Sequence, residues 1–143
     1  MTQQRRDLGE MLMRLGNAFV AAEGPVLAAR DLVMWDYVVL LALREGPARS
    51  QARLAELAGR DQTRLIPILD RLASAGLVRR EPDPADRRSR VVELTGEGRV
   101  LVEACRADIR ARESELLAAV PEHDRAAFVE RLQQVADSLT PWP

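Results

Sequence analysis

Residues 50–95 alternate helix caps, apolar repeats and glycines in an order that few folds accommodate. Ser50 can cap a short helix that ends at Gly59, and Asp61 can cap a second helix that ends at Gly76. The residues expected to face the core from these two helices are Leu54, Leu57, Ala58, Leu65, Ile68, Leu69 and Leu72. Two short helices joined by a tight turn containing glycine are typical of a helix-turn-helix, although an ordinary helical hairpin shows the same pattern.

Two short β-prone runs follow the second helix. Residues 77–80 and 90–94 are rich in apolar and β-branched side chains, and they flank a polar segment at residues 81–89. This order predicts a β-hairpin whose loop is residues 81–89, after which Thr95 can cap another helix. A helix-turn-helix followed by a hairpin is a winged helix.

Helices are also expected ahead of this central region. Apolar residues recur at three- and four-residue steps over residues 8–22, which predicts an amphipathic helix that ends near Gly24 and Pro25. Residues 34–43 are apolar nearly all round, as in a buried central helix, although their β-branched residues also allow a strand.

The net charge of −1 hides an uneven distribution of charge along the chain. From Arg44 to Arg90 there are 11 arginines against 7 acidic residues, net +4, which leaves 10 arginines against 15 acidic residues, net −5, elsewhere. A basic centre between acidic flanks is expected where only one surface meets DNA phosphates. All 21 basic residues are arginine, however, so a genome-wide codon preference could also account for their number.

The composition argues against catalytic and metal chemistry. The chain has one cysteine and one histidine, Cys105 and His123, on different expected helices, which cannot supply a catalytic triad or a multi-cysteine zinc site. We therefore expect no enzymatic activity, no metal and no cofactor. No apolar run approaches the length of a membrane span, and Glu10 and Arg14 interrupt the N-terminal apolar stretch, so we expect a cytoplasmic protein without a membrane partner.

Helical repeats at the two ends of the chain exceed what one small winged helix needs. Besides the first helix, residues 101–120 and 128–139 carry apolar stripes, separated by Pro121. These stripes could form an intramolecular bundle. A protein that binds a symmetric DNA site needs two DNA-binding units, however, so we expect a homodimer. The predicted fold is mainly α with a small β-hairpin, in a single domain at 1–143, with dimerisation helices at 1–30 and 100–143, a winged helix-turn-helix at 31–99 and its wing at 77–94.

Two blocks of this sequence resemble the MarR-type (multiple antibiotic resistance regulator) transcription factors. LAELAGRDQTRLIPILDRLASAGLVRR, residues 54–80, resembles the helix-turn-helix of the family, and DPADRRSRVVELTGEG, residues 83–98, resembles its wing, with the Asp-x-Arg pattern at Asp86 and Arg88. The resemblance implies an obligate dimer with interlocked terminal helices that binds a pseudo-palindromic operator and usually represses transcription. It also implies release from double-stranded DNA by a small, often phenolic ligand or by cysteine oxidation.

The second helix of the helix-turn-helix is the expected reader of the major groove. Gln62 could pair with adenine, Thr63 with a base edge or a phosphate, and Arg64 with guanine or a phosphate. Arg71 is expected to contact a phosphate or to form a salt bridge. Pro67 takes a place where the family commonly has a polar residue, and it should cost about 3 kcal/mol or force a kink, so we hypothesise that it changes the sequence preference. These side chains could also be merely solvated.

The wing supplies the remaining expected contacts with DNA. Arg88 is predicted at the tip, because a narrow minor groove concentrates negative potential and attracts a guanidinium. Asp86 would pair with an arginine and hold the loop in shape, while Arg87 and Arg90 are placed for contacts with the DNA backbone. A solvated charged hairpin is the alternative.

A ligand pocket is a further possibility between the first two helices and the long fifth helix. Met11, Met34, Trp35 and Tyr37 could line it and bind a small aromatic effector, or they could simply pack in the core. Cys105 is expected to be a packed core thiol. As an alternative function, the chain could be a winged-helix protein-interaction module without strong DNA binding.

Overall fold

The computed structural model describes residues 4–139, so the ends of the expected dimerisation ranges, residues 1–3 and 140–143, lie outside it. In chain order the elements are α1 (Leu8–Ala28), α2 (Met34–Arg44), α3 (Gln51–Ala58), α4 (Gln62–Ser74), β1 (Val78–Asp83), β2 (Asp86–Leu94), α5 (Gly96–Leu116), a 3₁₀ turn (Leu117–Ala119) and α6 (Glu122–Ser138). The fold is therefore mainly α with one antiparallel hairpin, as predicted.

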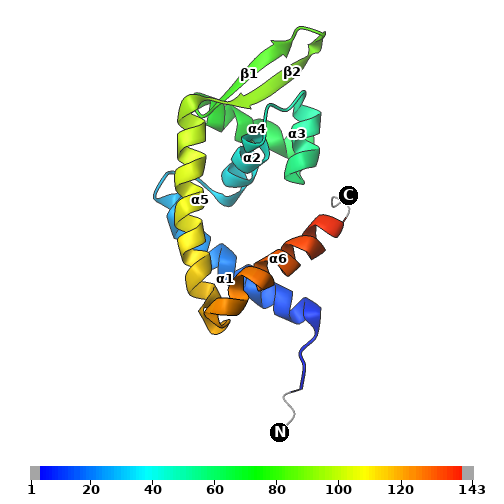
Figure 1. The fold of residues 1–143 in the computed structure, drawn as a ribbon. Helices are drawn as coiled ribbons and strands as arrows, with labels where there is room; N and C mark the ends of the chain where they lie inside the picture. The colour runs from blue at the N-terminus through cyan, green and yellow to red at the C-terminus, as the bar shows by residue number, and fades with distance from the viewer. Residues whose placement is uncertain (1–3, 140–143) are drawn as a thin grey trace.

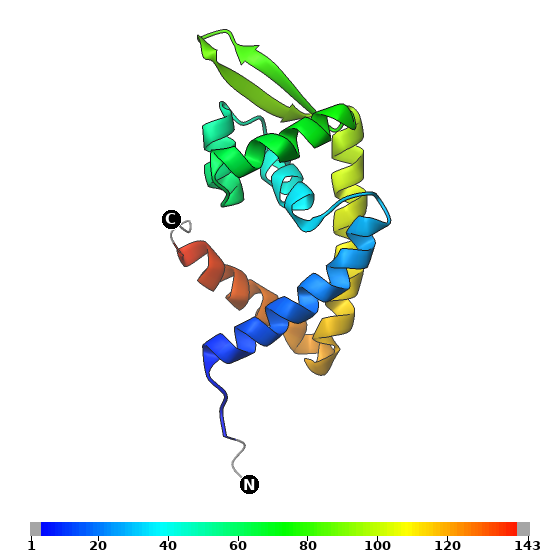
Figure 2. The same cartoon turned by 180° about the vertical axis from the view of Figure 1, so that it is seen from behind.

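The elements form two groups joined by the long helix α5 (Figures 1 and 2). Helices α2, α3 and α4 and the hairpin cluster around one end of α5, while α1 and α6 lie at its other end. One buried cluster holds the first group together, and it includes Leu40, Leu54, Leu65, Leu69 and Val92, each fully shielded from solvent. The winged helix is thus a packed unit carried on α5.

Local capping signals in the sequence are confirmed. The side chains of Ser50, Asp61 and Thr95 each accept a hydrogen bond of 3.0 Å from the backbone N–H three residues later. Gly59 and Gly76, with φ of 65° and 75°, adopt the left-handed conformation that ends a helix. The apolar segment at residues 34–43 is helical, and the alternative of a strand is excluded.

Two expectations about the helices are wrong. Helix α1 continues through Pro25 to Ala28, and burial of Leu27, which is 1% exposed, explains why the last turn stays helical despite the missing N–H. Leu57 of α3 is 51% exposed, because the buried face of this short helix runs through Leu54, Ala55 and Ala58 instead.

The hairpin is longer than the sequence predicted. Pairing of β1 with β2 continues to Glu81 opposite Val91 and Pro82 opposite Arg90, followed by an irregularity next to Asp83. Pro82 is tolerated because an outer strand of a two-stranded sheet needs no N–H there. The expected loop at residues 81–89 is therefore wrong, and only Pro84 and Ala85 form the turn.

Candidate nucleic-acid interface

The first turn of α4 presents polar side chains to solvent. Leu65 and Leu69 on the opposite side are completely buried, which fixes the rotation of the helix. As a result Gln62, Thr63 and Arg64 are all exposed. Arg64 also lies 3.3 Å from the carboxylate of its cap Asp61, with most of its side chain in solvent. The first turn is thus rigidly capped and open to a ligand.

Pro67 lies on the same exposed side of α4 and does not interrupt it. The helix is continuous from Gln62 to Ser74, so Pro67 removes a backbone bond without ending the helix. Its neighbour Ile66 is 39% exposed, an apolar side chain on a surface that is otherwise polar.

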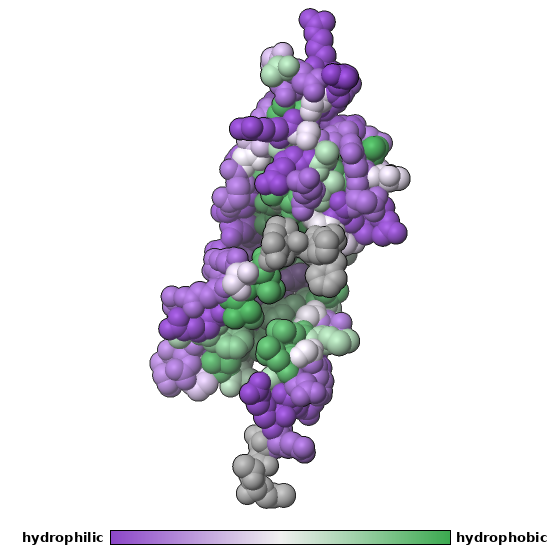
Figure 3. Space-filling model, turned by 90° about the vertical axis from the view of Figure 1, so that its right-hand side faces the viewer, coloured by the Kyte–Doolittle hydropathy of each residue, from purple (hydrophilic) through white to green (hydrophobic). Residues whose placement is uncertain are grey.

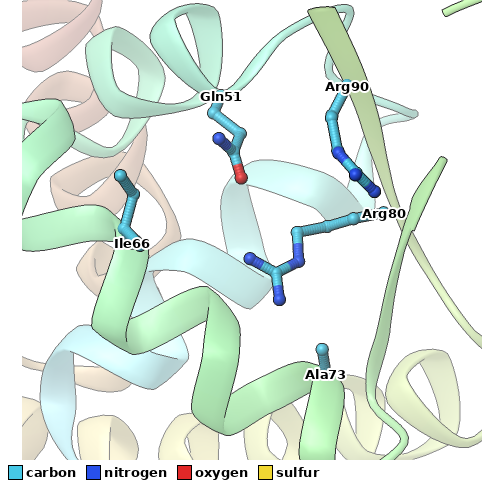
Figure 4. Close-up of a pocket in the computed structure, with 5 residues that line it drawn as sticks. All are labelled: Gln51, Ile66, Ala73, Arg80 and Arg90. Carbon is cyan, nitrogen blue, oxygen red and sulfur yellow. The ribbon is translucent and has the colours of Figure 1, made fainter. Parts of the chain in front are cut away.

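A groove of about 450 Å³ separates α4 from the wing. Ile66 and Ala73 line it from α4, Arg80 and Arg90 from the two strands, and Gln51 from the start of α3 (Figure 4). The nitrogen atoms of both arginines and the amide of Gln51 therefore point into one space beside the part of α4 that runs from Ile66 to Ala73.

The ion pairs around this groove leave it basic. Arg80 lies 2.7 Å from Asp70 of α4, and no carboxylate is among the five side chains that line the groove. Arg90 has no acidic partner within residues 4–139 and is exposed. Sequence reasoning missed Gln51 and Arg80, although Gln51 follows a recognisable helix cap and Arg80 ends the first β-prone run.

Strand alternation divides the wing arginines between two faces. Arg88 and Arg90 are on the face of β2 that also holds buried Val92, whereas Arg87 is on the opposite face. Asp86 holds Arg88 as expected, because its carboxylate accepts from the Arg88 backbone N–H at 3.0 Å and lies 3.7 Å from the guanidinium. The expectation that Arg88 lies at the tip is wrong, since the turn is two residues further out, but its side chain is 96% exposed.

Arg71 forms the salt bridge that was one of its two expected roles. Its guanidinium pairs with Asp36 of α2, a carboxylate that is 1% exposed and also accepts from the Val33 backbone N–H at 2.9 Å. A neighbouring cavity of about 230 Å³ is lined by these two side chains together with Arg30. Asp36 gave no signal in the sequence, because a single acid in an apolar helix has no partner in its own segment.

The four residues considered for a ligand pocket are not brought together within one chain. Tyr37 is buried, and burial raises the pKa of its hydroxyl to about 12, opposed by the nearby Arg106. Trp35 and Met34 are half-buried against the core, and the Trp35 ring carries the guanidinium of Arg60 at 3.7 Å. Met11 is half-buried near the far end of α1, roughly 24 Å along the helix from its buried last turn.

No helix within residues 4–139 is long and apolar enough to cross a membrane. The same residues contain no group of three or more histidine, cysteine, aspartate or glutamate side chains that could hold a metal ion.

Sequence comparison relates the chain to known repressors and regulators. The transcriptional repressor NicR of Pseudomonas putida is 34% identical over 76% of this chain and 68% of its own length. The transcriptional regulator HosA of Escherichia coli O157:H7 is 32% identical over 76% of this chain and 80% of its own length. HosA of Escherichia coli O111:H- is 42% identical over a shorter alignment, which covers 52% of this chain and 55% of that protein.

Solved structures share the fold over nearly the whole chain. The repressor CouR bound to a 23-mer DNA duplex has a TM-score of 0.78, with 28% identity over 91% of this chain and 92% of that one. Rv2887 of Mycobacterium tuberculosis, in complex with p-aminosalicylic acid, has a TM-score of 0.77, with 27% identity over 92% and 99%. BpsR of Bordetella bronchiseptica, whose DNA binding 6-hydroxynicotinic acid regulates, has a TM-score of 0.75, with 27% identity over 97% and 99%.

The fold and the relatives together identify this protein as a DNA-binding transcriptional regulator of the winged-helix class. The MarR family model matches residues 34–89, from the start of α2 to the wing. The chain belongs to the MarR family, as the resemblance predicted.

Proposed function

We propose that this protein is a cytoplasmic, homodimeric repressor that reads a pseudo-palindromic DNA site with the first turn of α4 and grips it with the wing. The observation that carries the proposal is the groove lined by Arg80 and Arg90 along α4, the helix whose first turn, Gln62–Arg64, is exposed. A recognition helix in the major groove places DNA phosphates on either side of it, where the donors of a wing can reach them. The proposed activity is binding alone, without catalysis.

Base reading is assigned to the first turn of α4, and phosphate binding to the groove. Gln62, Thr63 and Arg64 have the donors and acceptors that base edges in the major groove require. Arg90 supplies a positive charge without an acidic partner in residues 4–139, and Arg88 supplies one whose side chain is 96% exposed. Pro67 adds an apolar contact in place of a hydrogen bond, which supports its proposed effect on sequence preference.

The test is a binding titration at two or more salt concentrations on DNA that the wild-type protein selects from a random pool. Arg90→Ala and Arg88→Ala should each flatten the plot of log affinity against log salt by about one unit per half-site. Arg79→Ala is the matched control, because Arg79 belongs to the same wing but faces away and lies 2.9 Å from Glu93. Equal slopes for wild type, Arg88→Ala and Arg90→Ala would show that these wing arginines do not contact DNA phosphates. Weak binding without a salt slope would favour the protein-interaction module.

Dimerisation is supported by apolar surface that the single chain leaves uncovered. No residue of α6 is buried, and Figure 3 shows apolar side chains gathered in the half of the molecule that holds α1 and α6. The apolar side chains of these two helices that are at least 38% exposed include Leu8, Leu12, Leu15, Phe128, Val129, Leu132 and Val135, and Leu139 directly after α6 is exposed as well. A second copy would cover this surface and present two α4 helices roughly 34 Å apart, one turn of DNA.

Sedimentation velocity tests the dimer directly. Leu132→Asp should convert the protein to a monomer, because it places a charge on the apolar face of α6. Leu57→Asp makes the same change at a similarly exposed leucine of α3 and should leave the dimer intact. Wild-type protein that sediments as a monomer at micromolar concentration would refute the assignment.

A small aromatic acid is the proposed effector, by analogy with the ligands of Rv2887 and BpsR. The proposed ligand residues remain Met11, Met34, Trp35 and Tyr37, with Met11 available only where a second copy brings α1 close. Addition of p-aminosalicylate or 6-hydroxynicotinate should release the protein from fluorescently labelled DNA and so lower the fluorescence anisotropy of that DNA. Tyr37→Phe should weaken this response. Release that is equal for wild type and Tyr37→Phe would exclude Tyr37 from the ligand site.

A further inference from the structure

Two neighbouring residues of α2 hold arginines at opposite ends of α4. The Trp35 ring lies 3.7 Å from the guanidinium carbon of Arg60, which directly precedes the cap of α4. Asp36, the next residue, pairs with Arg71 in the last turn of α4. The first turn of α2 therefore contacts one residue just ahead of the cap of α4 and one residue in its last turn.

Pro67 occupies the middle of α4, where the helix is weakest. An α-helix would use the N–H of residue 67 to donate to the carbonyl of Thr63, and proline has no N–H. The first turn, which carries the proposed base-reading residues, is therefore tied to the rest of α4 by one hydrogen bond fewer. The helix is nevertheless continuous from Gln62 to Ser74, with Leu65 buried before Pro67 and Ile68, Leu69 and Leu72 buried after it. Contacts from a neighbouring element can add to this packing in holding the two parts in line.

Arg60 is held in a way that favours stacking over hydrogen bonding. Its Nε atom is buried and has no hydrogen-bond partner within residues 4–139. A buried donor without a partner costs stability, and the contact of the guanidinium with the Trp35 ring offsets part of that cost. A guanidinium suits that contact, because it is planar and more weakly hydrated than the ammonium group of lysine.

We propose that the first turn of α2 acts as a splint for the recognition helix across Pro67. In this arrangement the Trp35–Arg60 stack fixes the first turn of α4, and the Asp36–Arg71 pair fixes its last turn. Trp35 and Arg60 are then positioning residues for base selectivity, although neither needs to touch a base. The inference rests on the proposed function, in which the first turn of α4 reads DNA.

Arg60→Lys tests the stack while keeping the positive charge. The ratio of affinity for selected DNA to affinity for random DNA should fall about fivefold, and the salt slope should stay unchanged, because no phosphate contact is lost. Trp35→Phe leaves every charge in place and should lower the same ratio. Arg53→Lys is the matched control, since Arg53 is an exposed arginine of α3 that lies 2.9 Å from Glu56, and it should change nothing. A flatter salt slope for Arg60→Leu would identify Arg60 as a phosphate contact and overturn the positioning role.

A double-mutant cycle with Pro67→Ala tests the splint itself. Pro67 is exposed, so alanine restores the N–H toward Thr63 without opening a cavity. With the helix bond restored, the loss caused by Arg60→Lys should shrink to less than about twofold, with each background measured on the DNA that it selects. Fivefold losses in both backgrounds would refute the splint. Thermal unfolding of all four proteins shows whether each comparison is made between folded proteins.

Failure of the proposed function would look different from failure of the splint. If Gln62→Ala and Thr63→Ala leave the selected sequence unchanged, the first turn of α4 does not read bases and both proposals fall. If those variants change the selected sequence, but Arg60→Lys causes the same loss with and without Pro67→Ala, only the splint is wrong.

Discussion

Asp36 is the one buried charged side chain found within residues 4–139, and its ion pair gives a sharp prediction. Arg71→Leu removes the guanidinium and leaves the carboxylate 1% exposed, with only the 2.9 Å hydrogen bond from the Val33 N–H. A buried charge without a counter-ion is unfavourable, so the folded state should lose stability.

The size of the loss follows from how much water can reach the pair. Removing one partner of a fully buried pair costs about 3–5 kcal/mol. The Arg71 side chain is 51% exposed, so water can approach the vacated side of Asp36 and offset part of that cost. We expect about 2 kcal/mol, or roughly 6–8 °C in Tm for a chain of this size. The double variant Asp36→Asn/Arg71→Leu should be more stable than Arg71→Leu alone, because the uncompensated charge is gone.

Circular dichroism melts at one fixed protein concentration measure this effect, since a dimer would make Tm depend on concentration. DNA titrations on the same samples separate the two roles that the sequence allowed for Arg71. A salt bridge predicts a lower Tm and an unchanged salt slope. An unchanged Tm, together with a slope flattened by about one unit per half-site, would show that Arg71 binds phosphate and would refute the reasoning.

Three further predictions concern the packed unit. Cys105 is 0% exposed and burial raises its pKa, so iodoacetamide should modify it only after unfolding; rapid labelling of native protein would contradict this. Tyr37 is the single tyrosine, and its pKa of about 12 predicts that tyrosinate absorbance appears near pH 12 in native protein and near pH 10 in denaturant, with folding stability lost across that interval as pH rises. Gly98→Ala should destabilise by about 3 kcal/mol, because a Cβ there would overlap the Leu77 carbonyl, whereas Gly96→Ala meets open space; equal melting temperatures would refute this.

The elements that the sequence predicted well are those fixed by neighbours along the chain. Ser50, Asp61 and Thr95 cap their helices through the third following N–H, and Gly59 and Gly76 end helices by their own backbone conformation. Such signals operate within one turn, so no knowledge of packing is needed to recognise them.

The errors share a different cause, which is burial decided by distant segments. Burial of Leu27 in the common core lets α1 pass Pro25, which local rules treat as a stop. The salt bridge of Asp36 joins residues 35 positions apart, and Trp35 contacts Arg60 in the turn between α3 and α4. Neither partner is marked in the sequence, because an arginine with a buried carboxylate looks the same as an arginine in solvent.

The same limit applies to the charge argument for DNA binding. Of the 11 arginines from Arg44 to Arg90, seven lie within 4.0 Å of an acidic side chain. The remaining four, for which the described residues supply no acidic partner, are Arg49, Arg60, Arg87 and Arg90.

These salt bridges change which arginine of the wing we expect to contribute most to DNA binding. Arg60 stacks on Trp35, and Arg87 is on the outer face of the wing, so Arg90 is the one arginine lining the groove that has no acidic partner within residues 4–139. Arg88, the residue favoured by sequence, shares its charge with Asp86 at 3.7 Å. A phosphate that binds Arg88 must first displace Asp86, so this contact adds less binding free energy than a contact with the unpaired Arg90. We therefore expect Arg90→Ala to weaken DNA binding more than Arg88→Ala. The opposite order would mean that Arg88 leaves Asp86 and enters the minor groove, where the focused potential outweighs the lost pair.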